Sequence, residues 1–134
     1  SNWEGGIRTP AFVTGGALPA AMRGKTLDTR HGLIAAWDWY ATFAALAGAD
    51  PTDRKAKRAG LPPVESVNVW PLISGEVVTS PRQAIVVGTY VGESQFDKER
   101  GNEKATVGGL LAYKGDTLYK LILGQSGGGR GGGA

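Results

Sequence analysis

The sequence predicts a small α+β protein in which one amphipathic helix precedes a meander of antiparallel strands. Apolar residues at helical spacing occupy Arg30–Ala47. Residues 83–91 are dense in β-branched side chains, and residues 107–113 and 117–123 form two further strand-like runs around a Lys-Gly-Asp turn. The length of 134 residues suits a single small domain. With no cysteine and one histidine, His31, the chain excludes disulfides, thiolate nucleophiles and two-histidine metal sites.

The first segment is expected to form a glycine-containing turn followed by a strand. The paired glycines of Trp3–Pro10 allow tight backbone turns and disfavour a helix. The short apolar run Ala11–Thr14 predicts a strand, with Pro10 at its start, where a missing N–H costs least. Glu4 and Arg8 are four residues apart and are expected to form an ion pair that fixes this loop.

The central helix is predicted from a stripe of apolar residues at steps of three and four, while Leu33–Ile34 is expected to be extended. The stripe is expected to face the core and consists of Trp37, Tyr40, Phe43, Ala44, Leu46 and Ala47. Asp38 is expected to cap or complement the first turn. Gly48 stands where a helix is expected to end, and Pro51 follows.

A charged, proline-rich connector is predicted over residues 49–68. Its basic cluster, Arg54–Arg58, is interpreted as a solvated loop because no aromatic side chains alternate with the cations. The next segment, Val69–Gly75, predicts one helical turn, with Pro71 near its start and Gly75 at its end.

The last part of the chain is expected to be a small antiparallel sheet. Ser80–Arg82 opens it, residues 92–106 are polar and predict a loop, and alternation over residues 117–123 gives one wholly apolar face. That face consists of Tyr119, Leu121 and Leu123. Six of the 22 glycines lie in the last eight residues, so Gly124–Ala134 predicts a flexible tail.

The residues considered by themselves define no convincing active site. Trp3–Arg8 contains glycines but lacks the spacing of phosphate-binding loops, which leaves a structural turn or a backbone approach to an anion. His31 is interpreted as a surface or capping residue. Trp37–Tyr40 could stack on sugars, although core packing is favoured for Trp37 and Tyr40. No apolar run reaches 18 residues, so no transmembrane helix is predicted.

Five segments in order nevertheless resemble the sulfatase family, and most closely its arylsulfatase B-like branch. The first resembles W-E-G-G-x-R-x-P-x-F-V, the second L-I-H-x-x-D-W-L-P-T-L-x-x-L-A-G, and the third D-G-x-D-V-W-P-x-I-S-G. The five segments are Trp3–Val13, Leu33–Gly48, Val67–Gly75, Ser80–Arg82 and Tyr119–Gly124. Together they span most of residues 1–124, and their shared order makes the resemblance specific.

The resemblance implies a sulfuric ester hydrolase with an alkaline-phosphatase-like α/β fold. Such enzymes use a formylglycine made from cysteine or serine, and a calcium ion held by Asp and Asn residues. The family's motifs for both lie upstream of the matched segments, so no catalytic or metal-ligating residue is assigned in this chain. By resemblance, Asn2 and Trp3 lie nearest the active site, while Glu4 and Arg8 hold the loop that presents an upstream lysine.

Three positions depart from the family pattern. Ala35 replaces its histidine, Ala41 replaces the proline of its D-W-L-P turn, and Glu65–Ser66 replaces a D-G pair. These changes alter packing or loop geometry and put surface specificity in doubt more than ancestry.

The resemblance therefore predicts a C-terminal portion of a sulfatase that is inactive alone. Residues 1–79 would end the large α/β domain, residues 80–123 would form the small antiparallel subdomain, and residues 124–134 would be the tail. The expected partners are the upstream part of the sulfatase and a sulfate-ester substrate, with no nucleic acid and no membrane segment. Members of the family are typically secreted or lysosomal, and this sequence identifies no compartment.

Two alternatives remain open at the level of sequence. A non-catalytic module could bind sulfated carbohydrate through Trp37, Trp39 and Tyr40. A weaker alternative is nucleic-acid binding through the basic cluster Arg54–Arg58.

Overall fold

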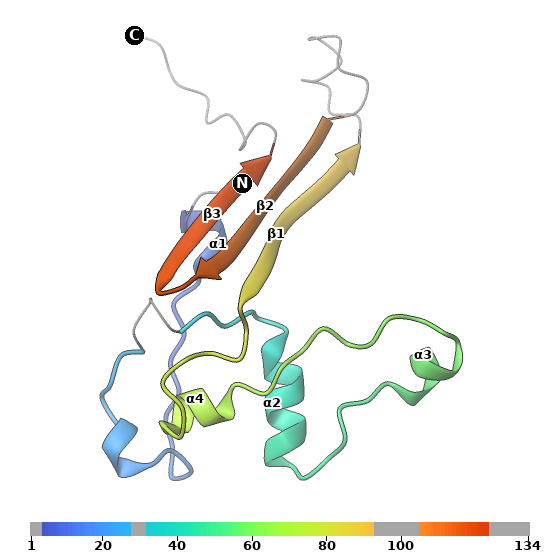
Figure 1. Cartoon of the computed structure of the whole chain (residues 1–134). Helices are drawn as coiled ribbons and strands as arrows, with labels where there is room; N and C mark the ends of the chain where they lie inside the picture. The colour runs from blue at the N-terminus through green and yellow to red at the C-terminus, as the bar shows by residue number, and fades with distance from the viewer. Residues whose placement is uncertain (1–3, 28–31, 93–104, 124–134) are drawn as a thin grey trace, which may run out of the picture. The chain divides into compact units, whose positions relative to one another are not determined.

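The computed structural model describes residues 4–27, 32–92 and 105–123 (Figure 1). It divides the chain into two compact units. Val13–Gln83 forms the helical unit, and Ser1–Phe12 together with Ala84–Ala134 forms the sheet unit.

The helical unit contains a short 3-10 helix and three α-helices. The 3-10 helix is η1 (Ala20–Met22), and the α-helices are α2 (Asp38–Leu46), α3 (Arg54–Arg58) and α4 (Trp70–Ser74). Its core consists of Leu18, Val69 and Ile73, against which partly buried side chains such as Trp39 and Trp70 pack. The predicted turn of α4 is confirmed, because Pro71 lies in its first turn and Gly75 ends it with a φ of 81°.

The central helix, α2, is confirmed. The prediction of which face of this helix is buried is wrong. Gly48 follows the helix with a φ of 66°, as predicted. The buried side chains are those of Asp38, Ala41 and Thr42. The predicted core stripe instead stays largely exposed, at 41% for Trp37, 52% for Tyr40, 60% for Phe43 and 49% for Leu46. The side chains on the buried face are small, so α2 lies close to the backbone of Val67 and Val69, whose N–H groups donate to Asp38 and Thr42. These hydrogen bonds favour burial of this face of α2.

Three other local expectations are also wrong. The basic cluster Arg54–Arg58 is a helix, although its cations are exposed as expected. Residues Glu4–Ile7 form the single helical turn α1 despite the two glycines, each of which costs only about 1 kcal/mol in a helix. Ala11–Thr14 does not form a strand, and Phe12 is 89% exposed. Among the described residues, no strand pairs with this run.

The sheet unit contains the antiparallel meander that the sequence predicts. Its strands are β1 (Ala84–Gly92), β2 (Ala105–Lys114) and β3 (Thr117–Leu123), in the order β1-β2-β3. Gly115 has a φ of 58° in the tight turn between β2 and β3, where Lys114 pairs with Thr117. A register irregularity between Val87 and Tyr90 interrupts the pairing of β1 with β2.

One face of this sheet is apolar and exposed. Val86 is opposite Leu110, which is opposite Leu121, and directly opposed residues share a face. These side chains are exposed by 57%, 36% and 54%, respectively. Tyr119 and Leu123 extend the same face and are also more than half exposed. The apolar face predicted for residues 117–123 is therefore present, and its side chains are exposed.

Candidate functional site

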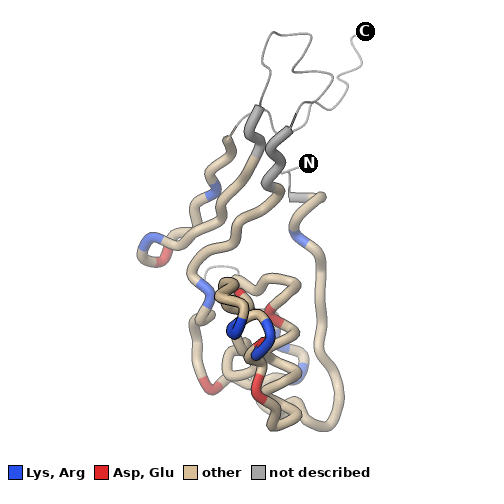
Figure 2. Tube along the Cα trace, turned by 90° about the vertical axis from the view of Figure 1, so that its right-hand side faces the viewer, with Lys and Arg blue, Asp and Glu red and all other residues tan. Residues whose placement is uncertain are grey.

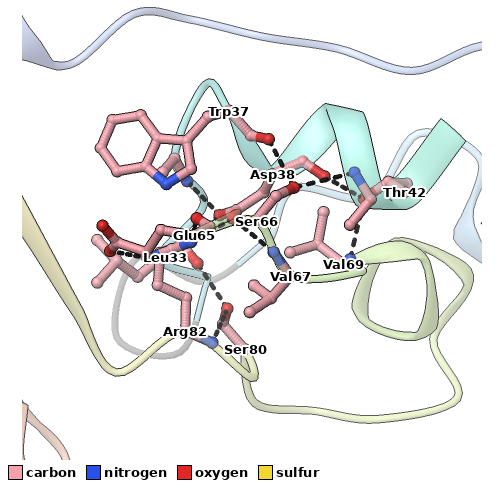
Figure 3. Close-up of polar contacts among 12 residues, drawn as sticks. Leu33, Trp37, Asp38, Thr42, Glu65, Ser66, Val67, Val69, Ser80 and Arg82 are labelled. Atoms are coloured by element: carbon pink, nitrogen blue, oxygen red, sulfur yellow. Dashed lines mark hydrogen bonds and ion pairs between the residues drawn. The ribbon is translucent and has the colours of Figure 1, made fainter. Parts of the chain in front are cut away.

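The most highly connected polar site lies at the start of α2, where the carboxylate of Asp38 is completely buried. Its Oδ2 accepts hydrogen bonds from the Ala35 backbone N–H at 2.8 Å and from Arg82 Nε at 2.6 Å. Its Oδ1 accepts from the Val67 N–H at 3.1 Å and from Arg82 Nη2 (Figure 3). The two oxygens thus accept four hydrogen bonds, which uses the full capacity of a carboxylate.

Arg82 meets this carboxylate in a two-pronged ion pair and is itself only 5% exposed. Its guanidinium also donates to the Glu65 backbone carbonyl at 2.8 Å and to the Glu65 carboxylate at 3.2 Å. The guanidinium carbon lies 5.4 Å from the centroid of the Trp37 ring, within range of a cation–π interaction. Hydrogen bonding to Asp38 raises the pKa of Arg82, against the opposing effect of burial. Arg82 therefore stays cationic although it is buried.

A short hydrogen-bonded link fixes the segment that carries Arg82. The Ser80 hydroxyl donates to the Leu33 carbonyl at 2.6 Å and accepts from the Arg82 backbone N–H at 3.1 Å. The chain before α2 and the chain before β1 are thereby joined across 47 residues of sequence.

Two hydroxyls join α2 to the segment before α4. Thr42 Oγ1 donates to the Asp38 carbonyl at 2.7 Å and accepts from the Val69 N–H at 3.0 Å. Ser66 Oγ donates to the Trp37 carbonyl at 2.7 Å and accepts from the Ala41 N–H at 2.9 Å. We call Asp38, Thr42, Ser66, Ser80 and Arg82 the Asp38–Arg82 network.

The Asp38–Arg82 network is suited to holding chain segments together. A carboxylate with four donors has no lone pair left to accept a proton from a substrate, and the permanently charged guanidinium is a poor acid. The predicted capping role of Asp38 takes a different form, because the N-cap position is Trp37 and the carboxylate binds Ala35, Val67 and Arg82. The site therefore positions three chain segments rather than performing acid–base chemistry.

The site residues predicted from the sequence lie elsewhere. Asn2, Trp3 and His31 fall outside the described residues, as does the side chain of Glu4. Arg8 is exposed, and the proposed Glu4–Arg8 pair remains a prediction. Of the aromatic residues in Trp37–Tyr40, Trp39 is half-buried, and its ring stacks on Phe43 with centroids 5.5 Å apart.

Most of the Asp38–Arg82 network was not predicted as a site. The sequence places Ser80–Arg82 at the start of the sheet and Asp38 in the first turn of a helix, and both lie in sulfatase-like segments, but nothing in the sequence pairs them. No periodic signal connects them, because the ion pair joins residues 44 positions apart.

Comparison of the chain with protein-family models, with curated proteins and with solved structures gave no match. Within the described residues, no group of three or more His, Cys, Asp and Glu side chains could hold a metal ion. None of the described helices has the length and apolar character required to cross a membrane.

Proposed function

We propose that this chain is the C-terminal portion of an arylsulfatase-type sulfuric ester hydrolase, in which it supports an active site that other residues provide. The observation that supports the proposal is that three sulfatase-like segments all contribute to the Asp38–Arg82 network. Leu33–Gly48 provides Asp38, Val67–Gly75 provides two backbone donors, and Ser80–Arg82 provides the arginine. The three segments that resemble sulfatases in sequence are thus also joined to one another by hydrogen bonds.

In this proposal the chain contributes positioning and no step of sulfate transfer. The family's calcium ion finds no suitable ligands among the described residues: the buried carboxylate of Asp38 is saturated, and no acidic cluster accompanies it. By the resemblance, the nucleophile and the calcium ligands would come from the upstream part of the enzyme. Sulfate-ester substrate would bind there as well.

A chimera tests the proposal. Residues 1–124 would replace the matching C-terminal portion of an arylsulfatase B-like enzyme, and turnover of p-nitrophenyl sulfate would be measured with calcium present. We expect activity from the chimera and none from the same enzyme truncated at the junction. A chimera that folds as a monomer, shows native circular dichroism and is inactive contradicts the proposal. So does turnover by the 134-residue chain alone above a blank.

A second candidate, a carbohydrate-binding module, is favoured by one observation. Trp37 and Tyr40 are 41% and 52% exposed near the start of α2, and exposed aromatic faces offer an apolar surface on which a sugar ring can pack. Calorimetric titration with a chondroitin sulfate oligosaccharide tests this function. Binding that is lost in Tyr40→Ala and kept in Leu46→Ala, a matched exposed apolar position on α2, would support it. Absence of heat change at millimolar oligosaccharide would contradict it.

A further inference from the structure

The helix α3 concentrates four positive charges in five residues, three of them in its last turn. Arg54, Lys55, Lys57 and Arg58 lie within five residues, and all four are exposed. Only Arg54 forms an ion pair among the described residues, with Asp50 at 3.5 Å. Like charges three and four residues apart destabilise a helix, and a helix this short is marginal in water. Figure 2, which views the molecule from the side that carries α3, shows this cluster toward the viewer.

Both ends of α3 nevertheless carry capping interactions that hold it in place. At the start, Asp53 Oδ1 accepts hydrogen bonds from the N–H groups of Lys55 and Ala56, both at 2.9 Å. At the end, Gly60 has a φ of 68°, and its N–H donates to the Lys57 carbonyl at 3.2 Å. The Leu61 N–H then donates to the Ala56 carbonyl at 3.0 Å, which completes a Schellman motif. The sequence thus fixes a repulsive cluster in one conformation, an arrangement suited to the display of charge.

An apolar pocket adjoins this helix. It has a volume of about 450 Å³, and its lining includes Lys57, Leu61, Pro63 and Val64. Leu61 is 60% exposed and Val64 is 45% exposed. The lining also includes Asp53, whose Oδ1 already accepts hydrogen bonds from the N–H groups of Lys55 and Ala56. The apolar residues beside the Lys57 ammonium fit a ligand that has both an apolar group and negative charge.

We propose that α3 and this pocket form a docking site for an acidic peptide segment of a partner protein. Carboxylates of the peptide would pair with Lys55, Lys57 and Arg58, and one apolar side chain would occupy the pocket. Charge complementarity argues for an acidic partner, and the apolar residues of the pocket argue for a peptide over a nucleic acid. The pocket lining contains no aromatic side chain on which a base could stack. This inference is independent of the proposed sulfatase function.

Fluorescence anisotropy with the 134-residue chain tests the docking site. The probe is a fluorescein-labelled ten-residue peptide with six acidic residues and two leucines. Its comparison peptides replace either the acidic residues with amides or the leucines with serines. We expect the acidic, leucine-containing peptide to bind about tenfold more tightly than either comparison peptide. Binding should weaken as salt is raised, because exposed charges are screened.

Variants locate the interaction on the surface. The triple variant Lys55→Gln, Lys57→Gln and Arg58→Gln should weaken binding about tenfold, because it removes three exposed ion pairs with the peptide, each of which contributes modestly. Val64→Thr, which keeps the shape of the pocket, should weaken it about threefold. Lys114→Gln removes an exposed cation in the sheet unit and should leave binding unchanged. Circular dichroism would establish that each variant is folded.

Three outcomes would overturn the proposal. The first is equal binding of the neutral and acidic peptides, and the second is absence of binding at 1 mM peptide. The third is tighter binding of a single-stranded oligonucleotide of equal charge, which would identify a nucleic-acid surface instead.

Discussion

The two units of this chain are organised on opposite principles. The helical unit places its most specific contacts in the interior, where Asp38 and Arg82 form a buried ion pair. The sheet unit is ordered by backbone pairing along β1, β2 and β3, while one of its apolar faces stays exposed. A buried charge tolerates only one arrangement of its neighbours, whereas an apolar surface can pack against many partners. The stability of the helical unit is therefore expected to be sensitive to replacement of single buried polar residues. The stability of the sheet unit is expected to be sensitive to substitutions that disturb the pairing of its strands.

The largest effect is expected at the buried ion pair. Asp38→Ala leaves the guanidinium of Arg82 without its carboxylate and removes the acceptor of two backbone N–H groups. Loss of one partner of a buried pair costs about 3–5 kcal/mol. Urea unfolding followed by tryptophan fluorescence would measure the change in the free energy of unfolding.

Glu65→Gln is the matched control for this prediction, because Glu65 contacts the same arginine from a side chain that is 75% exposed. Its removal should cost less than about 1 kcal/mol. Equal costs for Asp38→Ala and Glu65→Gln would show that burial does not set the strength of this network.

A smaller loss is expected at the hydroxyl that joins α2 to the segment before α4. Thr42→Val keeps the side-chain shape but leaves the buried Val69 N–H without its acceptor. An unsatisfied buried donor costs about 1–3 kcal/mol. The free energy of unfolding measured in urea should fall by this amount, whereas Thr79→Val, at an exposed threonine, should have almost no effect.

In the sheet unit, a glycine of β2 is expected to be sensitive to an added side chain. A Cβ at Gly109 would lie 2.8 Å from Val87 Cγ2 and 3.2 Å from the Val87 carbonyl oxygen. Gly109→Ala should therefore destabilise the sheet by about 1–2 kcal/mol, measured as faster amide hydrogen exchange along β1 and β2. Gly5→Ala, which adds a Cβ with no atom within 4 Å, should leave exchange in the sheet unchanged.

The sequence predicts those parts of this fold that local rules determine. The stop at Gly48, the turn of α4 and the hairpin at Gly115 follow from backbone preferences that a few residues set. The helix α3 has four basic residues around Ala56 and therefore no apolar period that would predict it, although Asp53 and Gly60 are residue types typical of helix caps.

The orientation of α2 could not be derived from its periodicity. Trp37 and Tyr40 indicate one face, but contacts with residues 27 to 44 positions away select the face that carries Asp38 and Thr42. The same distance in sequence hid the Asp38–Arg82 network, since neither residue is unusual until the other is placed beside it.

The smallest effect is expected on the exposed apolar face of the sheet. Leu121 is 54% exposed, so Leu121→Thr removes little buried surface and introduces a residue with high β-propensity. The free energy of unfolding should change by less than about 0.5 kcal/mol, and binding of the dye ANS should decrease. Ile85→Thr, at a strand position only 6% exposed, should cost about 2 kcal/mol by comparison. If Leu121→Thr costs as much as Ile85→Thr, the apolar face of the sheet is covered in solution. The sheet unit would then, like the helical unit, bury its most sensitive contacts.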